Sequence, residues 1–301
     1  MLKTFKQFIK AKTTKVPIAD YYPSHGTHAQ AKVPVADYKP SHGKHSMEEA
    51  ARIPKPMSHD EFTNLNPNSK IHPSVFGVHE KLNPSTEKWD KELSTPEKEA
   101  VRSYTGSSVS SNRELIDTAN GRPSNFEQHE SDDKWTKDWK NDNEKNHHRL
   151  VNNLDSVLNR SKVPRNLTVF HGINAPSSEK FNPGKAASQH PERHVRMPAY
   201  LSTTVDPHIA SNFAKPETWE NDNRVPTTTH MLRIHLKRGQ KGFRYVGERS
   251  AIQAEREGIL KRDSVLKIGE HPTVVHHPKT GGQIHVWDAH LVDHPDDHQK
   301  D

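Results

Sequence analysis

The pattern of apolar and polar positions divides the chain into two parts. Before about residue 93, proline, asparagine, serine and histidine interrupt the apolar runs, and we interpret residues 50–90 as loop or linker. Beyond this point the apolar positions become periodic. The segment LSTPEKEAVRSY predicts a helix capped by Ser94 or Thr95, with Pro96 at its first position. In NHHRLVNNLDSVLNR, four apolar residues share one helical stripe and predict a second helix: Leu150, Leu154, Val157 and Leu158.

Short runs rich in β-branched and aromatic residues follow from residue 165. Gly, Pro or polar turns separate them, which is typical of strands: NLTVFHG, AYLSTT, HMLRIHLKRG, GILKRDSVLKI and GQIHVWDAHLV. Between two of these runs, DPHIASNFA predicts a short helix that begins at Asp206 and Pro207. Helices followed by strands indicate an α+β fold.

Composition limits how much of the chain can pack into a core. Only 30% of the 301 residues are hydrophobic, the mean hydropathy is −1.02, and we expect residues 1–85 to be flexible. The absence of cysteine excludes disulfides, thiolate catalysis and cysteine-ligated zinc. A net charge of +6 is compatible with nucleic acid or acidic partners. No apolar run approaches the roughly 18 residues of a membrane span, so we expect none.

The N-terminal part holds two further patterns. MLKTFKQFIK places apolar residues on one helical face with lysines around it, which predicts a short basic amphipathic helix; the alternatives are a frayed terminus, an address read by a partner, or membrane-surface contact. A tandem repeat then starts at Lys15 and again at Lys32, 17 residues apart. Each copy carries a histidine pair, so the repeat is either a metal site or a His-rich linker, and we favour the linker.

The stretch IQAEREGIL contains the clearest candidates for catalytic residues. Glu255 and Glu257 are two positions apart, directly before an apolar run that predicts a strand. Residues at i and i+2 of a strand point to the same face, so the two carboxylates would lie together. The segment alone allows two interpretations: a solvated charged edge, or a paired-carboxylate active site.

Three segments decide between these interpretations by their order. LTVFHG at 167–172, YLSTT at 200–204 and EREGIL at 255–260 resemble the aromatic-Arg-Gly, Ser-Thr-Ser and Glu-x-Glu motifs of mono-ADP-ribosyltransferases. LSTPEKEAVRSYTGSSVSSNREL also resembles the helical segment that precedes the catalytic sheet in that family. The resemblance covers about residues 93–292. It implies a split β-sandwich with a helical N-terminal lobe, in a catalytic domain that we place at residues 86–301.

The resemblance also implies roles for individual residues. Glu257 would stabilise the positive charge that develops on the ribose when nicotinamide leaves NAD, and Glu255 would orient or deprotonate the nucleophile. A Glu at the first position of the motif goes with arginine acceptors in this family. Ser202 would hold Glu257, while Thr203 and Thr204 support the strand. Phe213 matches an aromatic residue that stacks on nicotinamide, although core packing is an equal alternative.

The first motif departs from the family pattern. His171 stands where the family usually has Arg, followed by the expected Gly172. Histidine offers fewer donors and no permanent charge, so phosphate binding should weaken, with Arg165 or Arg149 as candidate replacements. A related branch of the superfamily uses His before Gly to bind the adenosine ribose, so the site is either a hybrid of two types or degenerate. Thr204, in place of the more usual Ser, keeps the hydroxyl.

The chain looks most like the transferases of large tailed bacteriophages, which modify host proteins. MLKTFKQFIK resembles the leader peptides that target such enzymes to the phage head, which implies capsid partners, a place in the virion and later in the host cytoplasm. The nearest alternative is a secreted bacterial toxin. We expect a monomer that uses NAD, needs no metal and modifies a protein acceptor. A non-catalytic capsid or nucleic-acid-associated protein is the competing function, and a metal-dependent hydrolase lacks a recognisable ligand spacing.

Overall fold

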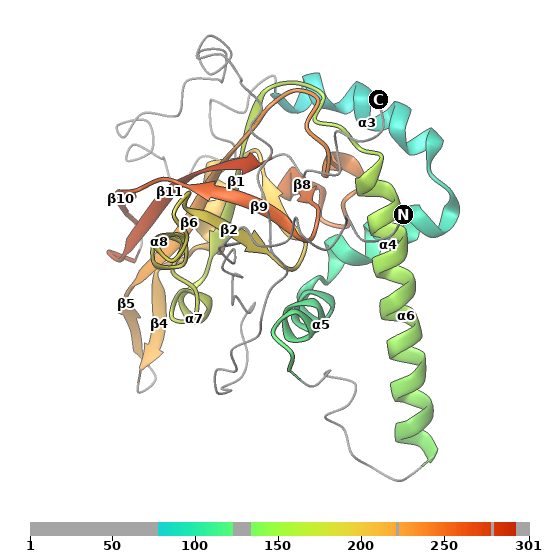
Figure 1. The fold of residues 1–301 in the computed structure, drawn as a ribbon, viewed down its shortest axis with the longest axis horizontal. Helices are drawn as coiled ribbons and strands as arrows, with labels where there is room; N and C mark the ends of the chain where they lie inside the picture. Colours follow the sequence, from blue (N-terminus) through green and yellow to red (C-terminus); the bar gives the residue numbers. More distant parts are fainter. Residues whose placement is uncertain (1–77, 123–133, 221–222, 278–279, 293–301) are drawn as a thin grey trace, which may run out of the picture.

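The computed structural model describes residues 78–122, 134–220, 223–277 and 280–292. The basic N-terminal segment and the His-rich repeat lie outside these residues. Helices form one lobe of the described part and a curved sheet forms the other (Figure 1). The helical lobe contains α3 (Val78–Glu92), α4 (Thr95–Gly106), α5 (Val109–Ala119) and α6 (Lys134–Asn159). No described helix is long and apolar enough to cross a membrane.

The two helices predicted from periodicity are present and pack on each other. The predicted stripe of α6 faces α4, and Leu154 and Leu158 share a buried cluster with Val101 and Tyr104. Burying this stripe removes apolar side chains from water, at about 25 cal/mol per Å² of apolar surface. The pairing of an amphipathic stripe with a facing helix is what the sequence pattern required.

Helix α3 corrects the interpretation of residues 50–90 as loop or linker. The chain is helical from Val78 to Glu92, through Pro84, and the proposed domain start at residue 86 lies inside the helix. Proline in a helix interior removes a backbone donor, which is why the sequence pattern spoke against a helix here. Tertiary packing compensates: Leu82 and Trp89 are buried, and the Arg244 guanidinium lies 4.5 Å from the Trp89 ring centroid.

The remaining elements run from residue 167 to residue 292. They are β1 (Leu167–Ile173), α7 (Ala175–Ser178), α8 (Pro183–Ser188), β2 (His194–Met197), β3 (Leu201–Thr204), α9 (Pro207–Phe213), β4 (Glu217–Glu220), β5 (Asn223–Pro226), β6 (Thr228–Leu236), β7 (Phe243–Tyr245), β8 (Glu257–Leu260), β9 (Ser264–Ile268), β10 (Thr273–His276) and β11 (Gln283–Val292). Two 3₁₀ turns, η2 (Gly247–Arg249) and η3 (Gln253–Glu255), precede β8. The predicted helix α9 begins after Asp206, whose side chain caps the backbone N–H of His208 at 3.0 Å.

The sheet is almost divided in two. Its strand order is β2-β9-β11-β6-β1-β3-β8-β7, with β10 on β11, and β11 pairs with β6 in parallel. Between β1 and β3 only one position is paired, Phe170 opposite Thr204. The long strands β6 and β11 therefore belong to one half, and β3, β8 and β7 to the other. This division leaves the ends of β1, β3 and β8 open to a shared pocket, and the mixed α+β fold is as expected.

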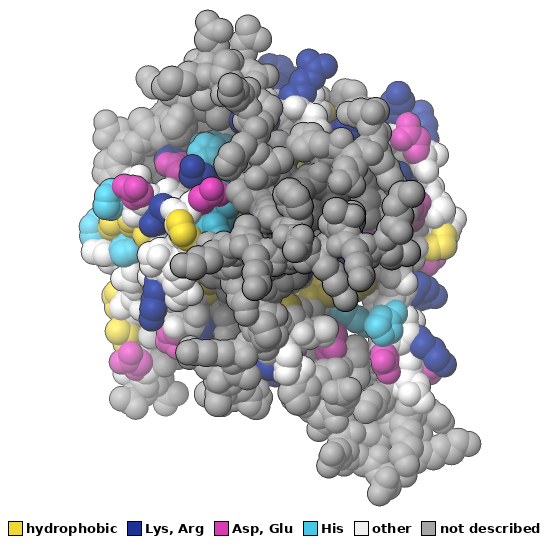
Figure 2. Space-filling model, in the orientation of Figure 1, with side chains coloured by type: hydrophobic (Ala, Val, Ile, Leu, Met, Phe, Trp, Pro, Cys, Tyr) yellow, Lys and Arg dark blue, Asp and Glu magenta, His cyan; other side chains and the backbone are white. Residues whose placement is uncertain are grey.

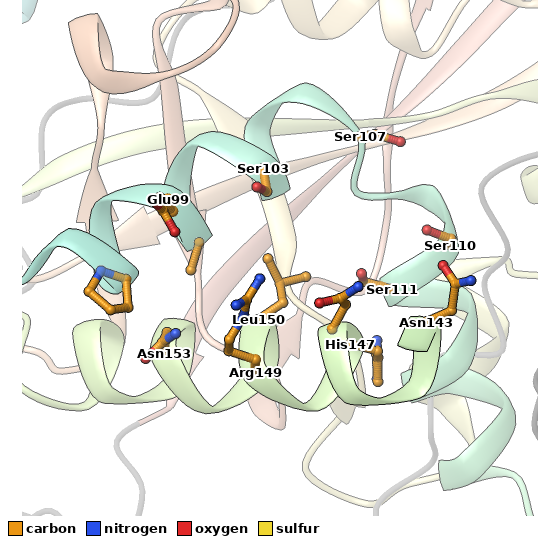
Figure 3. A pocket seen from close by; sticks show the side chains of 13 residues that line it. Glu99, Ser103, Ser107, Ser110, Ser111, Asn143, His147, Arg149, Leu150 and Asn153 are labelled. Atoms are coloured by element: carbon orange, nitrogen blue, oxygen red, sulfur yellow. The ribbon is translucent and has the colours of Figure 1, made fainter. Parts of the chain in front are cut away.

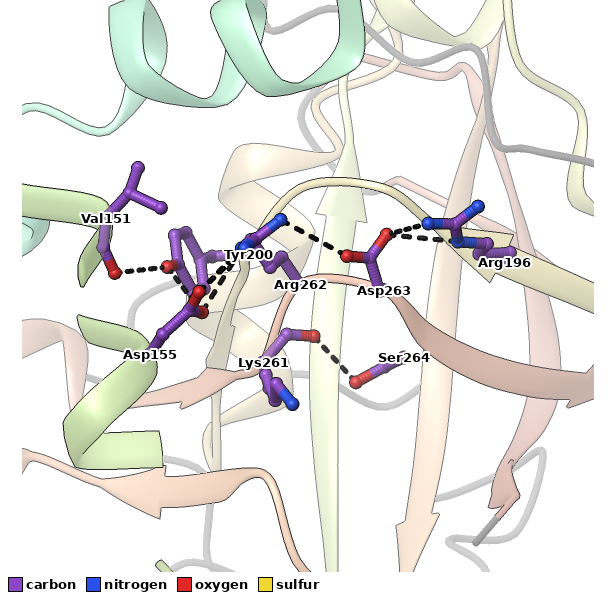
Figure 4. Close-up of polar contacts among 8 residues, drawn as sticks. All are labelled: Val151, Asp155, Arg196, Tyr200, Lys261, Arg262, Asp263 and Ser264. Atoms are coloured by element: carbon purple, nitrogen blue, oxygen red, sulfur yellow. Dashed lines mark hydrogen bonds and ion pairs between the residues drawn. The ribbon is translucent and has the colours of Figure 1, made fainter. Parts of the chain in front are cut away.

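A polar network ties the helical lobe to both halves of the sheet (Figure 4). Asp155 on α6 accepts a hydrogen bond from the Tyr200 hydroxyl at 2.8 Å and pairs with Arg262 at 2.7 Å. In the turn between β8 and β9, Asp263 pairs with Arg196 of β2 at 2.6 Å. Because Tyr200 directly precedes β3, this network fixes the strand that carries Ser202.

One part of the sheet is rich in histidine. Figure 2 shows histidine side chains among acidic and basic ones over β10 and β11. On the neighbouring strands β6 and β11, histidines occupy paired positions: His230 lies opposite His285 and His235 opposite His290. Asp288 accepts from His235 Nε2 at 2.9 Å and pairs with Arg233 at 2.6 Å. This side chain therefore balances the local positive charge.

Candidate active site

A pocket of about 360 Å³ lies where the two halves of the sheet meet. It is in the size range of small-molecule sites. The end of α4, strands β1 and β3, helix α9 and the turn before β8 contribute its walls. Eight of the residues named from the sequence line it: His171, Gly172, Ser202, Thr203, Thr204, Phe213, Glu255 and Glu257.

Glu257 is the first residue of β8 and lies opposite Thr204 of β3. Its side chain is 2% exposed. The Ser202 hydroxyl donates to Oε1, and the Ser250 hydroxyl donates to Oε2 at 3.0 Å. Burial raises the pKa of Glu257 to about 7, with a smaller contribution from nearby Glu255, while the two serine hydrogen bonds act in the opposite direction. The carboxylate is thus buried, held at both oxygens, and binds a proton more readily than an ordinary glutamate.

Glu255 reaches the same pocket by a route that the sequence analysis did not foresee. It ends the turn η3 instead of continuing strand β8, so the expected same-face arrangement on one strand is wrong. Between the two glutamates, Arg256 adopts a left-handed conformation with φ of 47°. This conformation is uncommon for a residue other than glycine and reverses the chain locally. Burial raises the pKa of Glu255 above its ordinary value.

Arg256 itself turns away from the two carboxylates that flank it. Its Nη1 lies 3.0 Å from Oδ2 of Asp206, which is fully buried at the start of α9. A buried carboxylate needs such a partner, because an unpaired buried charge is costly. The ion pair therefore holds the turn in place and keeps the guanidinium off Glu255 and Glu257.

Thr203 and Thr204 support the strand, as expected, through their side chains. Thr203 Oγ1 donates to the backbone oxygen of Gly258 at 2.8 Å. Thr204 Oγ1 donates to the backbone oxygen of Glu255 at 2.7 Å, and accepts from Asp206 N at 3.0 Å. Thr204 thus connects β3, the turn that carries Glu255 and the start of α9.

His171 is held by the strand that bears Ser202. Its Nδ1 lies 2.7 Å from the Ser202 backbone oxygen, and because a carbonyl only accepts, Nδ1 carries the proton. Burial lowers the pKa of His171, so the ring is neutral at pH 7, although the backbone hydrogen bond opposes this effect. The side chain offers the pocket a neutral imidazole in place of the permanent charge of arginine.

Gly172 and Phe213 define how α9 meets β1. A Cβ on Gly172 would lie 2.2 Å from Ala210 O and 2.6 Å from Ala214 N, so only glycine permits this close approach. At the end of α9, the Phe213 side chain is 51% exposed and lines the pocket. The equal alternative of core packing for Phe213 is therefore wrong, because half of the side chain faces solvent.

Neither arginine considered as a replacement for the missing motif arginine lines this pocket. Arg149 lines a separate groove of about 670 Å³ between α4, α5 and α6, together with serine and asparagine side chains (Figure 3). Arg165 is exposed in the segment before β1. Ser107, at the end of α4, lines both the groove and the pocket.

Sequence reasoning missed two contributors to the site. Ser250 lies seven residues before Glu257, in a segment without periodicity, and nothing local marks its contact with the carboxylate. Thr105, at the end of α4, accepts from Ala251 N at 2.8 Å and lines the pocket. The similarity of YTGSSVSSNREL to the family's helical segment is the signal that leads to Thr105; the Ser250 contact becomes visible only in three dimensions.

The described residues contain no group of three or more His, Asp or Glu side chains that could hold a metal ion. What the pocket offers is two carboxylates of different burial. No lysine or arginine among the described residues forms an ion pair with Glu257. Such a site can stabilise a positive charge that develops in a substrate and can accept a proton from a nucleophile.

Comparison with known proteins identifies the family. The sequence matches the ADP-ribosyltransferase exoenzyme family over residues 82–290. A comparison with curated proteins finds no match. Among solved structures, the fold is similar to Plx2a, an ADP-ribosyltransferase toxin from Paenibacillus larvae, with 16% identity, a TM-score of 0.52 and coverage of 73% of this chain and 97% of that one.

A second similar structure is BECa, an ADP-ribosylating toxin of a binary enterotoxin of C. perfringens, solved with NADH. The identity is 19%, the TM-score is 0.52, and the alignment covers 73% of this chain and 49% of that one. At these identities the likeness shows the fold, and the family match extends over more than half of the chain. The chain therefore belongs to the ADP-ribosyltransferase exoenzyme family, as an enzyme that transfers ADP-ribose from NAD to protein.

Proposed function

We propose that this enzyme transfers ADP-ribose to arginine side chains of host proteins, with Glu257 and Glu255 in separate roles. The observation that carries the proposal is the placement of both carboxylates in one pocket, with one buried and the other half-buried. A group that stabilises a substrate charge benefits from burial, whereas a group that meets an incoming protein must be reachable. The two burial levels match these two tasks.

Glu257 acts on the ribose of NAD. When the bond to nicotinamide breaks, positive charge develops on the sugar, and a carboxylate fixed beside it lowers the barrier. The Ser202 hydroxyl donates to one oxygen of this carboxylate. Burial raises its pKa to about 7, so the ionised form is poorly solvated. A poorly solvated carboxylate interacts more strongly with a nearby positive charge.

Glu255 acts on the acceptor. An arginine guanidinium is planar, permanently charged and suited to bidentate pairing with a carboxylate, and it must lose a proton to become a nucleophile. A half-buried carboxylate at the pocket wall can pair with the guanidinium and accept this proton as the new bond forms. A neutral glutamine at this position would keep the shape and remove the base.

The NAD-binding roles fall to β1 and α9. The neutral His171 ring contributes hydrogen bonding to the cofactor, and the exposed face of Phe213 stacks on nicotinamide. In this proposal the site is active with His171, since the ring is locked to the backbone of the strand that carries Ser202. Phosphate charge is then balanced less strongly than by arginine, which predicts weak binding of NAD.

We also propose that the enzyme is encoded by a bacteriophage and packaged in its particles. The segment MLKTFKQFIK and the repeat lie outside the described residues, so the fold lends support only to the catalytic part. Mass spectrometry of purified phage particles tests packaging: peptides of this chain are expected in the particles. If they are absent and the protein is found in a bacterial culture supernatant, a secreted toxin replaces the phage enzyme.

The acceptor class is tested with labelled NAD and two peptides that differ only in having Arg or Lys at one position. We expect label on the Arg peptide alone, and label on proteins of a bacterial lysate. Glu255→Gln should lose transfer by about 100-fold while NAD hydrolysis survives. Equal labelling of the Lys peptide, or unchanged transfer by Glu255→Gln, would overturn the arginine assignment. If the wild-type enzyme neither transfers nor hydrolyses, the non-catalytic alternative gains support.

A further inference from the structure

The loop between η2 and η3 contains a buried hydroxyl with an unusual set of partners. Ser250 is 5% exposed and does not line the pocket. Its Oγ lies 3.0 Å from Glu257 Oε2 and 3.3 Å from the backbone oxygen of Ile252, and it accepts from Ile252 N at 3.1 Å. A serine hydroxyl has one proton, and the shorter contact to a group that becomes charged is the stronger bond.

The same loop is anchored from the other side by the helical lobe. The backbone N–H of Ala251 donates to Thr105 Oγ1 at 2.8 Å, at the end of α4. A Cβ on Gly106 would meet the Ala251 Cβ at 3.4 Å, so the Ala251 side chain lies next to the helix end. Ser250 therefore sits on a short segment whose position is fixed by α4.

The two oxygens of Glu257 are held from two different parts of the molecule. Ser202 belongs to β3, whereas Ser250 belongs to the loop. The terminal torsion of a glutamate side chain is soft, so a carboxylate held at one oxygen can still rotate. Holding both oxygens defines the carboxylate plane, and the loop supplies the second contact.

We propose that Ser250 is a positioning residue for the ADP-ribosyl transfer reaction, which fixes the plane of the Glu257 carboxylate and favours its ionised form. This inference rests on the proposed role of Glu257. It also links the site to the acceptor side, because the loop that carries Ser250 leads directly through Ile252 into the turn that ends at Glu255.

The charged and titratable groups around Glu257 come from three directions. Glu255, from the preceding turn, raises the pKa of Glu257, and His171 faces the pocket from β1 as a neutral ring. Arg256 is paired with Asp206, and Tyr245 lies on β7 opposite Gly258. Removing the Ser250 hydroxyl leaves all five groups in place, so a change in the pH profile reports the lost hydrogen bond.

The test is the pH dependence of NAD hydrolysis by the full-length Ser250→Ala enzyme, with purified NAD as the only substrate. A lost donor to the ionised carboxylate raises the pKa of Glu257, so the acid limb of the profile should move to higher pH by about one unit. We expect kcat to fall about tenfold at neutral pH, with little change in KM. Ser250→Thr keeps the hydroxyl and should restore both the profile and kcat.

Ser264→Ala is the matched control. Its hydroxyl donates to the Lys261 backbone oxygen at 2.6 Å in the turn after β8, and this variant should behave as wild type (Figure 4). Circular dichroism and thermal melting show whether each variant is folded. If Ser250→Ala misfolds, a carboxyl carbon NMR titration of Glu257 compares wild type with Ser250→Cys, whose thiol is a weak donor. An unchanged pKa of Glu257 in Ser250→Cys overturns the inference.

A folded Ser250→Ala enzyme with wild-type kcat and an unmoved acid limb would also overturn the inference, even if Glu257→Gln is inactive. An active Glu257→Gln enzyme would instead remove the proposed function on which the inference rests. The two failures are therefore distinguishable within one set of variants.

Discussion

Two buried glutamates in this enzyme have similar serine partners and opposite chemical character. Glu97, at the start of α4, accepts from Ser94 N and from Ser156 Oγ, each at 2.9 Å. Glu257, in the pocket, accepts from Ser202 and Ser250. A hydrogen bond from Arg160 lowers the pKa of Glu97 to about 2 against the opposing effect of burial, whereas burial raises the pKa of Glu257 to about 7.

The difference lies in where the arginines point. Arg160 Nη1 lies 2.6 Å from Glu97 Oε1 and completes a capping arrangement that stabilises α4. Arg256 is adjacent to Glu257 in sequence but pairs with Asp206 instead. Arg160 thus balances the charge of Glu97, and this ion pair stabilises the fold. Glu257 has no such cation among the described residues, so its negative charge is available for the reaction. Carboxylates with strongly shifted pKa values cluster at functional sites, although structural ion pairs also shift pKa values. Glu257 is an example of the first case and Glu97 of the second.

The largest effect that this comparison predicts is on activity. Glu257→Gln removes the charge that stabilises the ribose, so both transfer and NAD hydrolysis should fall by at least about 100-fold. Glu97→Gln should leave both rates within about twofold, because Glu97 lies outside the pocket. Rates with labelled NAD check both variants. Comparable losses of activity in the two variants would contradict the assignment of a catalytic role to Glu257 and a structural role to Glu97.

The next effect is on stability: Glu257→Gln, which should lose activity, should gain stability. Because the folded-state pKa of Glu257 is raised from 4.5 to about 7, its ionisation costs stability as the pH rises through this window. Glu257→Gln should therefore be more stable than wild type at pH 8, by on the order of 3 kcal/mol, and this gain should vanish near pH 4. Urea unfolding at both pH values measures it. A destabilised variant at pH 8 would contradict the buried-charge account.

Glu97 should show the reverse pH dependence. Its folded-state pKa is lowered, so its stabilisation is fully present above pH 4.5 and is lost as the pH falls from there towards about 2. Glu97→Gln should cost about 1–2 kcal/mol at pH 7, a discounted figure because the Arg160 side chain is 43% exposed to solvent. Urea unfolding at pH 7 and pH 3 checks this, with Glu99→Gln, on an exposed position of the same helix, as the control.

The smallest effect tests how His171 contributes to the pocket. His171→Ala removes the donor to the Ser202 backbone and should lower kcat about tenfold. His171→Asn can keep a donor near the Nδ1 position, so it should retain most of kcat and mainly raise the KM for NAD. Steady-state hydrolysis separates the two constants. Identical behaviour of the two variants would show that the hydrogen bond to Ser202 does not matter.

The sequence was sufficient wherever a local rule applies. Pro96 with an acidic first turn marked α4, the stripe that includes Leu154 marked α6, and Asp206 followed by proline marked α9. It failed for α3, because Pro84 breaks the local rule and the segment is helical with Leu82 and Trp89 buried in tertiary contacts. Periodicity reports local preference, and packing can override it.

By itself, the sequence determined the order of three motifs, the residue types that line the pocket and the α+β class. Tertiary structure alone decided how the two glutamates reach that pocket. The turn η3 stands where a strand was expected, Arg256 adopts a left-handed conformation, and Arg256 pairs with Asp206. It also decided that Ser250 holds Glu257 and that no arginine does so among the described residues. Proton affinity depends on burial and on the nearest charge, and both are set by groups distant in sequence.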